Sequence, residues 1–240
     1  GLNYKSINTD GENAVMFASY GARRRAAKLE VFQYMEELGL EVDVVNWEGQ
    51  TPMHNMIRKA NPEIIDFFVE RGLNINQIDE SGNTVMINAM GGKLENIQKL
   101  QPLVNDINHR NQEGYSALTM AIRRGAKETF DYLLEFGVDV QHVDADGNNL
   151  LYHVYDAFNP KKEEIFGHFL DQLHAQGVKV SENYDKGNTL AHIAIEKESA
   201  FLLTKAIELG ASLNHKNQVG LSTLHLAASK AKNDDMLSIL

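Results

Sequence analysis

Apolar and polar residues follow each other along this chain in short blocks that return at nearly constant intervals. Each block opens on a glycine and continues with a run whose apolar residues stand four, seven and eight places after it. A second run follows, apolar at places 15, 16 and usually 19. Residues 111–143 show the regular form, with Leu118, Ala121 and Ile122 in the first run and Phe130 and Leu133 in the second. Spacings of three and four residues predict pairs of short amphipathic helices.

The opening glycine returns with a period near 33 residues. It stands at Gly11, Gly49, Gly82, Gly114, Gly147, Gly187 and Gly220, at intervals of 38, 33, 32, 33, 40 and 33 residues. A fixed period of this size is typical of stacked repeats, in which each helix pair contacts only its neighbours. We therefore expect one array over residues 1–240, with repeats that start near residues 8, 46, 79, 111, 144, 184 and 217 and a truncated last repeat.

Turn and cap residues keep the same register in the repeats. Two places after the glycine stands a side chain that can cap a helix: Asn13, Thr51, Thr84, Ser116, Asn149, Thr189 or Ser222. Three places before it an Asn or Asp favours the turn, with Tyr184 as the exception. Glycines such as Gly72 end the second helix in a left-handed conformation, a role that falls to Asn105 in the third repeat. Helices this short are marginal alone, so stacking must stabilise them.

Three stretches resemble the ankyrin repeat signature. They are Gly49-Gln50-Thr51-Pro52-Met53-His54, then Gly187-Asn188-Thr189 with His192 and Ala194, and Gly220 with Leu224, His225 and Ala227. The resemblance implies an all-α repeat solenoid of about 6.5 helix-turn-helix pairs joined by hairpin-like turns. It also implies that His54, His192 and His225 hold turns together by hydrogen bonds. The positions expected to be structural are Gly49, Thr51, His54, Gly82, Thr84, Gly114, Ser116, Gly147, Gly187, Thr189, His192, Gly220, Ser222 and His225.

Three repeats depart from the norm. The first and fifth carry insertions at residues 22–27 and 156–162, both between the two helices of a repeat. We interpret each insertion as a tolerated surface loop rather than as a binding element. In the third repeat Gly91 and Gly92 end the first helix, and Pro102 should stop or kink the second. Residues 1–3 align with residues 72–74, which suggests a piece of a longer array.

Composition narrows the classes of function. A net charge of −10 and a pI near 5.4 argue against nucleic acid or an anionic membrane as partner. The chain has no cysteine and no apolar run long enough to span a bilayer. Zinc-protease, phosphate-loop and hydrolase motifs are missing, so we expect no catalysis, no cofactor and no metal site. A soluble monomer is expected, in the cytoplasm rather than the periplasm or outside the cell.

The variable positions of the repeats suggest where a partner binds. In the ankyrin fold these positions form a concave face from hairpin tips and first helices. The predicted surface, contiguous across three repeats, is Trp47, Arg58, Lys59, Tyr115, Arg123 and Arg124. Two plainer interpretations stay open: the Trp47 ring packs flat on a neighbouring hairpin, and the cations complement helix dipoles. A wider basic row would add Arg23, Arg24, Arg25, Lys93, Lys197 and Lys230.

These patterns predict a non-catalytic scaffold that binds another protein. The alternative is a targeting or regulatory module of a larger multidomain enzyme or secreted effector, and a third possibility is an enzyme in its own right. The complete reading frame separates the first two, and turnover by this chain alone would establish the third.

Overall fold

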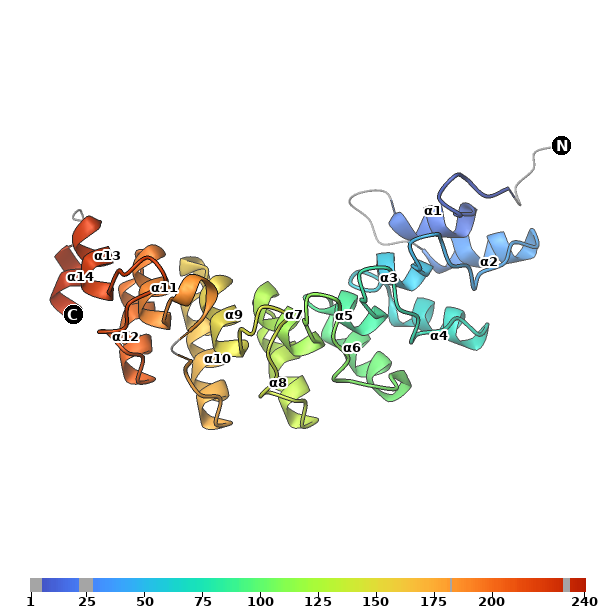
Figure 1. Ribbon diagram of the computed structural model, residues 1–240. Helices are drawn as coiled ribbons and strands as arrows, with labels where there is room; N and C mark the ends of the chain where they lie inside the picture. Colours follow the sequence, from blue (N-terminus) through green and yellow to red (C-terminus); the bar gives the residue numbers. More distant parts are fainter. Residues whose placement is uncertain (1–5, 22–27, 182, 231–233) are drawn as a thin grey trace. The chain divides into compact units, whose positions relative to one another are not determined.

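The computed structural model describes residues 6–21, 28–181, 183–230 and 234–240, which form short α-helices joined by turns (Figure 1). The first helices of the repeats, called inner helices below, are α1 (Ala14–Tyr20), α3 (Pro52–Met56), α5 (Val85–Ala89), α7 (Ala117–Arg124), α9 (Leu150–Asp156), α11 (Leu190–Glu196) and α13 (Thr223–Ser229). The outer helices are α2 (Leu29–Glu37), α4 (Pro62–Glu70), α6 (Leu94–Leu100), α8 (Lys127–Glu135), α10 (Glu163–Ala175), α12 (Ala200–Glu208) and α14 (Asp234–Ile239). The expected all-α repeat solenoid is confirmed. The insertion at 22–27 lies outside the described residues.

The chain divides into two units, Gly1–Met120 and Ala121–Leu240, and the boundary falls inside α7. In the first unit α1 packs beside α3 and α3 beside α5, while the outer helices α2, α4 and α6 form a second row. In the second unit α9, α11 and α13 form the inner row, and α8, α10, α12 and α14 form the outer row. Inner and outer helices of one repeat share a buried apolar layer, which is the expected reason that such short helices persist.

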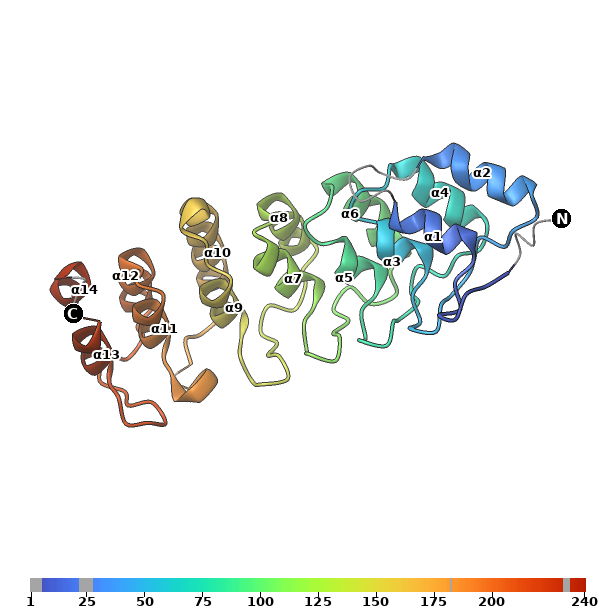
Figure 2. The same ribbon diagram turned by 90° about the horizontal axis from the view of Figure 1, so that it is seen from above.

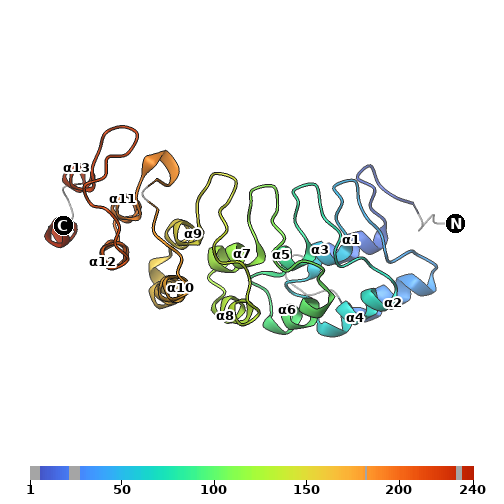
Figure 3. The same cartoon turned by 60° about the horizontal axis from the view of Figure 1, so that its bottom comes forward.

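Turns before the inner helices of the first unit lie side by side and project from one edge (Figures 2 and 3). Each hairpin of this unit after the first donates a backbone amide, two places before its glycine, to a carbonyl of the preceding hairpin. The three bonds are Trp47 N to Asp10 O (2.9 Å), Glu80 N to Glu48 O (2.8 Å) and Gln112 N to Ser81 O (3.0 Å). Successive tips of this unit are therefore linked by main-chain hydrogen bonds, to which the side chains of Trp47 and Gln112 add further bonds.

The turn chemistry of a hairpin is clear at residues 79–83. The Asp79 carboxylate accepts hydrogen bonds from the amides of Ser81 (3.0 Å) and Asn83 (2.7 Å). Gly82 adopts φ +79°, a left-handed conformation that suits glycine. The following hairpin approaches so closely that a Cβ on Gly82 would lie 2.9 Å from the amide nitrogen of Gln112. Glycine is required here both for its conformation and for its small size.

Capping side chains begin several inner helices at the expected places. Asn13 accepts hydrogen bonds from the amides of Val15 and Met16, and Thr84 accepts one from Ile87. At Thr51, Thr189 and Ser222 the capping hydroxyl and the histidine three residues later bind each other's backbone, which forms a capping box. These contacts satisfy amides that helix geometry leaves without an intrahelical acceptor.

The prediction for Asn105 is wrong. Among the described residues other than glycine, positive φ occurs only at Lys186 and Glu198. The third repeat instead ends α6 at Leu100, and Pro102 lies in a 3-10 turn over Gln101–Leu103, as expected for a proline inside a helix. The Asn105 amide then donates to the side chain of Asn76 of the preceding repeat (2.9 Å), so a contact between repeats replaces the left-handed cap.

The insertion at residues 156–162 is packed into the second unit. Its Phe158 ring stacks on Phe201 with centroids 5.9 Å apart and meets Phe166 edge-on at 5.7 Å. Asn159 accepts a hydrogen bond from Lys161 N at 3.0 Å and caps the short turn Pro160–Lys162. The insertion therefore contributes an aromatic side chain to the packing between α10 and α12.

Replacing Phe158 with alanine is expected to destabilise the protein by about 1–3 kcal/mol, because a half-buried ring loses two aromatic partners. Urea unfolding followed by circular dichroism measures the change. Phe136→Ala is the control, since that ring is 46% exposed and should cost less than about 1 kcal/mol. Equal effects of the two changes would show that the insertion is only a surface loop.

Candidate partner-binding surface

Trp47 lies at the tip of the second hairpin, where it is both packed and exposed. Its Nε1 donates to the carbonyl of Thr9 at 3.0 Å. One face of the ring lies over Gly11, because a Cβ there would be 2.7 Å from the indole. The side chain is nevertheless 65% exposed. The ring therefore rests on the neighbouring hairpin, as the plainer interpretation expected, and still offers its other face to a partner.

Arg58 and Lys59 follow α3 in the same repeat. This helix has five residues, and the turn after it exposes both side chains. The next repeat comes close to the backbone here, since a Cβ on Gly92 would lie 2.6 Å from Cα of Arg58. In the part of the chain that the structure describes, neither cation has an ion pair or a side-chain hydrogen bond. The two charges are thus available to an acidic partner.

Two exposed aromatic residues of the first repeat were missed by sequence reasoning. Phe17 and Tyr20 on α1 are 56% and 47% exposed, and their rings meet edge-on with centroids 6.2 Å apart. The Tyr20 hydroxyl donates to the carboxylate of Glu12, and desolvation together with this carboxylate raises the pKa of Tyr20 to about 12. A signal was present, because Tyr20 stands nine places after its glycine, the same place as Arg58.

Tyr115 lies two hairpins further along than Trp47 and is half-buried. Its backbone is tied to Asn111, with the Tyr115 amide donating to the Asn111 side chain at 2.9 Å and the Asn111 amide donating to Tyr115 O at 3.1 Å. Tyr115 therefore belongs to an arm of the hairpin rather than to its tip. It therefore offers less free surface than Trp47.

Arg123 and Arg124 belong to the second unit, at the end of α7. Arg124 is exposed, whereas Arg123 places Nη1 2.8 Å from the carboxylate of Asp156. Lys197 Nζ donates to the carbonyl of the same Asp156 at 2.7 Å, at the end of α9. Lys230 Nζ likewise donates to Glu196 O at the end of α11 (2.8 Å). Cations beside carbonyls that end helices support the dipole interpretation for Lys197 and Lys230, whereas Arg123 pairs with a carboxylate.

The other members of the basic row are also accounted for. Lys93 Nζ lies 3.2 Å from both the Asn61 side chain and the Glu95 carboxylate. The three arginines at 23–25 lie outside the described residues. The described members of the row are therefore mostly engaged in contacts between repeats, whereas Arg58 and Lys59 are exposed and form no ion pair with a described residue.

Two of the three histidines in the repeat signature make hydrogen bonds between repeats. His54 Nε2 contacts Asn83 O at 3.3 Å, and His192 Nε2 contacts Leu221 O at 3.0 Å. Burial lowers the pKa of both imidazoles. His168 lies against Asp131 of α8, so it is paired rather than simply solvated. Within residues 6–21, 28–181, 183–230 and 234–240, no three His, Asp or Glu side chains are placed to hold a metal ion.

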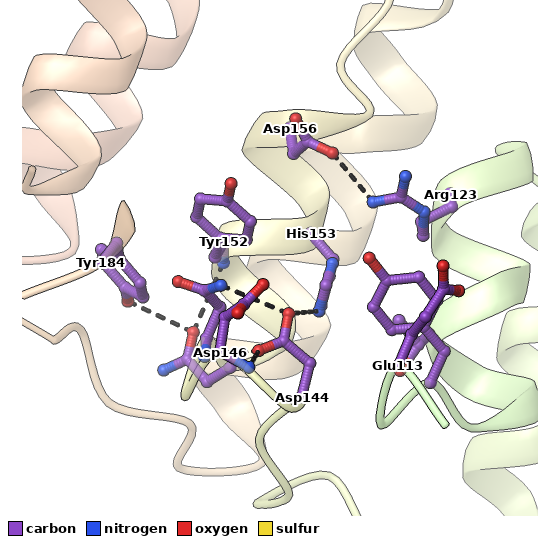
Figure 4. A network of polar contacts seen from close by, with 12 residues as sticks. Glu113, Arg123, Asp144, Asp146, Tyr152, His153, Asp156 and Tyr184 are labelled. Atoms are coloured by element: carbon purple, nitrogen blue, oxygen red, sulfur yellow. Dashed lines mark hydrogen bonds and ion pairs between the residues drawn. The ribbon is translucent and has the colours of Figure 1, made fainter. Parts of the chain in front are cut away.

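A buried polar network lies at the fifth hairpin (Figure 4). His153 on α9 is 1% exposed, and its Nε2 lies 3.2 Å from the Asp144 carboxylate. Asp144 also accepts hydrogen bonds from the amides of Asp146 and Asn148 at 3.0 and 2.8 Å. Burial lowers the pKa of His153 to about 4, although Asp144 acts in the opposite direction. The carboxylate of Asp144 thus holds the turn of the fifth hairpin and lies against the buried imidazole of α9.

Comparison with known proteins supports the repeat assignment. Residues 85–159 match three copies of the ankyrin repeat, and residues 48–77 match one. The ankyrin repeat domain of Bcl-3, a unique member of the IkappaB protein family, superposes with TM-score 0.66 at 22% identity, covering 96% of this chain and 98% of that one. The human ASB11 ankyrin repeat domain gives TM-score 0.73 at 19% identity over 95% and 98% of the chains.

A curated relative is the E3 ubiquitin-protein ligase KEG of Arabidopsis thaliana, 28% identical over 134 residues. The match spans 55% of this chain and 8% of the ligase. The helix pairs, hairpins and capping boxes recur at equivalent positions of successive repeats and define a helix-pair repeat protein. Ankyrin repeats of this kind serve as protein–protein interaction modules. Residues 48–77 and 85–159 are ankyrin repeats, and the fold of the described residues is that of ankyrin repeat domains. Among its described residues, no helix combines the length and the hydropathy needed to cross a bilayer.

Proposed function

We propose that this chain binds a protein partner, without catalysis, through exposed aromatic and basic side chains of its first unit. The observation that carries the proposal is the exposure of Trp47, Phe17 and Tyr20 in the two repeats that also present Arg58 and Lys59. Tryptophan, tyrosine and arginine are the side chains most enriched among residues that dominate binding energy. This surface lies on the inner helices and hairpin tips, the face expected for ankyrin recognition.

The partner that fits this surface carries an acidic segment with an apolar side chain. Arg58 and Lys59 supply two charges without ion pairs to described residues, and a complementary acidic segment would favour and orient association. Of the other predicted contact residues, Arg124 is exposed on the second unit and is proposed as a further contact. Tyr115 and Arg123 contribute less, since one is half-buried and the other pairs with Asp156.

A double variant tests this function. Trp47→Ala with Arg58→Ala is expected to weaken the affinity for a partner captured from the source cells by at least about tenfold, measured by calorimetry with the purified partner. Phe136→Ala with Lys179→Ala is the matched control, because it removes one exposed aromatic ring and one exposed cation elsewhere. Unchanged affinity in the first variant, or an equal loss in the control, would contradict the proposed surface.

A second candidate is a targeting or regulatory module of a larger enzyme. The likeness to an 8% segment of a ubiquitin ligase favours it, because there a similar stretch forms part of a multidomain enzyme. The complete reading frame decides between the two: a catalytic domain in the same polypeptide supports the module, and its absence supports the stand-alone scaffold.

A further inference from the structure

Two glycines of the third repeat stand where the second repeat carries two cations. Counted from the opening glycine of each repeat, Gly91 and Gly92 occupy the ninth and tenth places, and Arg58 and Lys59 occupy the same places one repeat earlier. Helix α5 ends at Ala89, before these glycines, and α3 packs beside α5 in the first unit. The two cations therefore adjoin a short stretch of the third repeat that carries no side chains.

The main chain at these glycines lies against that of the second repeat. A Cβ on Gly92 would be 2.6 Å from Arg58 Cα and 2.8 Å from Arg58 O. The Gly92 amide donates to Ala89 O at 2.9 Å. Gly91 is exposed, and its amide has no hydrogen-bond acceptor in the part of the chain that the structure describes. One main-chain donor is thus available next to the backbone of Arg58.

Lysines at the tenth place of a repeat are used differently in the two units. Lys197 and Lys230 of the second unit stand at this place, and each donates Nζ to the carbonyl at the ninth place of the preceding repeat. These bonds are 2.7 Å to Asp156 O and 2.8 Å to Glu196 O. Lys59 stands at the same place, but its Nζ has no hydrogen bond or ion pair with a described residue. Packing between repeats therefore accounts for the lysines of the second unit and does not account for Lys59.

A third cation follows the two glycines. Lys93 comes directly after Gly92 and places Nζ 3.2 Å from the side chain of Asn61, the residue that precedes α4 in the second repeat. The same Nζ lies 3.2 Å from the carboxylate of Glu95. One of the three positive charges at this junction between the second and third repeats is therefore neutralised by a carboxylate. The other two have no ion pair with a described residue.

Carboxylates at the hairpin tips limit the kind of anion that can bind beside these cations. Glu48 and Glu80 are exposed at the tips of the second and third hairpins and form no ion pair with a described residue. Desolvation is the main cause of the raised pKa of Tyr20, and the charge of Glu48 adds to it, which places Glu48 near the inner helices. These charges, in a chain of net charge −10, repel nucleic acid and anionic membranes. A single anionic side chain of a partner segment is repelled far less.

We propose that Arg58, Lys59 and the Gly91 amide bind a phosphoryl group on a side chain of the partner segment. This inference rests on the proposed function and names the anionic group that the first unit recognises. A phosphorylated side chain carries a charge of about −1.5 to −2 at pH 7 and three acceptor oxygens, which match two unpaired cations and one free amide. A carboxylate brings a single charge and leaves one cation without a partner. The missing side chains at Gly91 and Gly92 leave room for the tetrahedral group.

Fluorescence polarisation with labelled peptide pools tests the proposal. The pools share random flanking residues and carry phosphothreonine, threonine or glutamate at the fixed central position. The chain is expected to bind the phosphothreonine pool at least about tenfold more tightly than either of the others, because only this group engages both cations and the amide. Equal affinity for the phosphothreonine and glutamate pools would overturn the phosphoryl site and leave an acidic partner, and with it the proposed function, in place. An oligonucleotide that competes as well as the phosphothreonine pool would assign the site to nucleic acid and overturn the proposal.

Paired substitutions locate the site. Arg58→Gln with Lys59→Gln removes two exposed charges, so the variant should fold as the wild type does, as circular dichroism will show. It is expected to bind the phosphothreonine pool no more tightly than the threonine pool. Lys161→Gln with Lys179→Gln is the matched control, because these cations are also exposed and have no ion pair with a described residue, and it should keep the preference. An equal loss in the control would reduce the effect to general charge attraction and overturn the proposal.

The role of the main-chain amide has its own measurement. In amide proton–nitrogen NMR spectra the Gly91 signal should shift when the phosphothreonine pool is added, and the Gly137 signal, from the end of α8, should not. A Gly91 signal that stays in place while the pool binds would overturn the proposed site. Phosphatase treatment of the purified partner separates the two proposals. A partner that still binds with unchanged affinity, and still depends on Trp47, would overturn the phosphoryl site and uphold the proposed function.

Discussion

Replacing Gly82 with alanine is expected to destabilise the protein by about 3 kcal/mol or more, one of the largest effects of any single change in the first unit. Part of the cost, about 1 kcal/mol, comes from forcing a residue with a Cβ into φ +79°. The remainder comes from the backbone of the fourth hairpin, since the new Cβ would lie 2.9 Å from Gln112 N and 3.1 Å from Cα of Asn111. Backbone atoms cannot move aside as a flexible side chain can, so the two hairpins must separate.

Gly72→Ala separates these two contributions. Gly72 has φ +86°, yet nothing lies within 4 Å of a Cβ built on it, so this variant should lose only the conformational part, about 1 kcal/mol. Urea unfolding of both variants measures the difference. Equal losses would show that the hairpins do not need their close approach, and that the backbone link between their tips contributes little to stability.

Acid is expected to destabilise the second unit through His153. In the folded chain its pKa is about 4, whereas an unfolded histidine titrates near 6.5. The unfolded chain therefore binds the proton first as pH falls. Stability that is fully present above pH 6.5 is lost progressively toward pH 4, by about 3 kcal/mol in total. Burial is the main cause of the lowered pKa of His153; Asp144 and Asp156 oppose it, and Arg123 and His142 add to it.

The measurement is the free energy of unfolding in urea between pH 7.5 and 4.5. His153→Gln should have a shallower pH dependence than the wild type, because glutamine does not titrate. The lowered pKa values of His54 and His192 act in the same direction and stay present in both proteins, so the difference isolates His153. Identical slopes for His153→Gln and the wild type would show that the buried imidazole does not govern acid stability.

Much of the architecture could be predicted because it depends on local chemistry that recurs every repeat. Gly82, Asp79 and Thr84 specify a turn and a helix start within six residues, and the same spacing seven times over leaves little freedom of interpretation. Asn105 shows the limit of this reasoning. Its residue type and position predicted a left-handed cap. In the structure Pro102 changes the course of the chain before Asn105, and the Asn105 amide contacts Asn76 instead.

The candidate site was harder to predict because exposure depends on neighbours. Trp47 could be singled out as an unusual residue at a tip, but its contact with Gly11 and Thr9 joins positions almost a whole repeat apart. Phe17 and Tyr20 looked like ordinary apolar positions of an amphipathic helix until the structure showed them uncovered. Phe158 is the opposite case, since a residue in an insertion proved to pack between two aromatic rings.

The link between hairpin tips has a consequence for how such a surface diversifies. Trp47, Glu80 and Gln112 each join the preceding hairpin through a main-chain amide, and the side chains of Trp47 and Gln112 add hydrogen bonds to Thr9 O and Glu80 O. The main-chain bond itself does not depend on which side chain stands at these positions, so it should be kept when the residue type changes. The binding specificity of the surface can thus change one hairpin tip at a time while the backbone link between successive tips is retained.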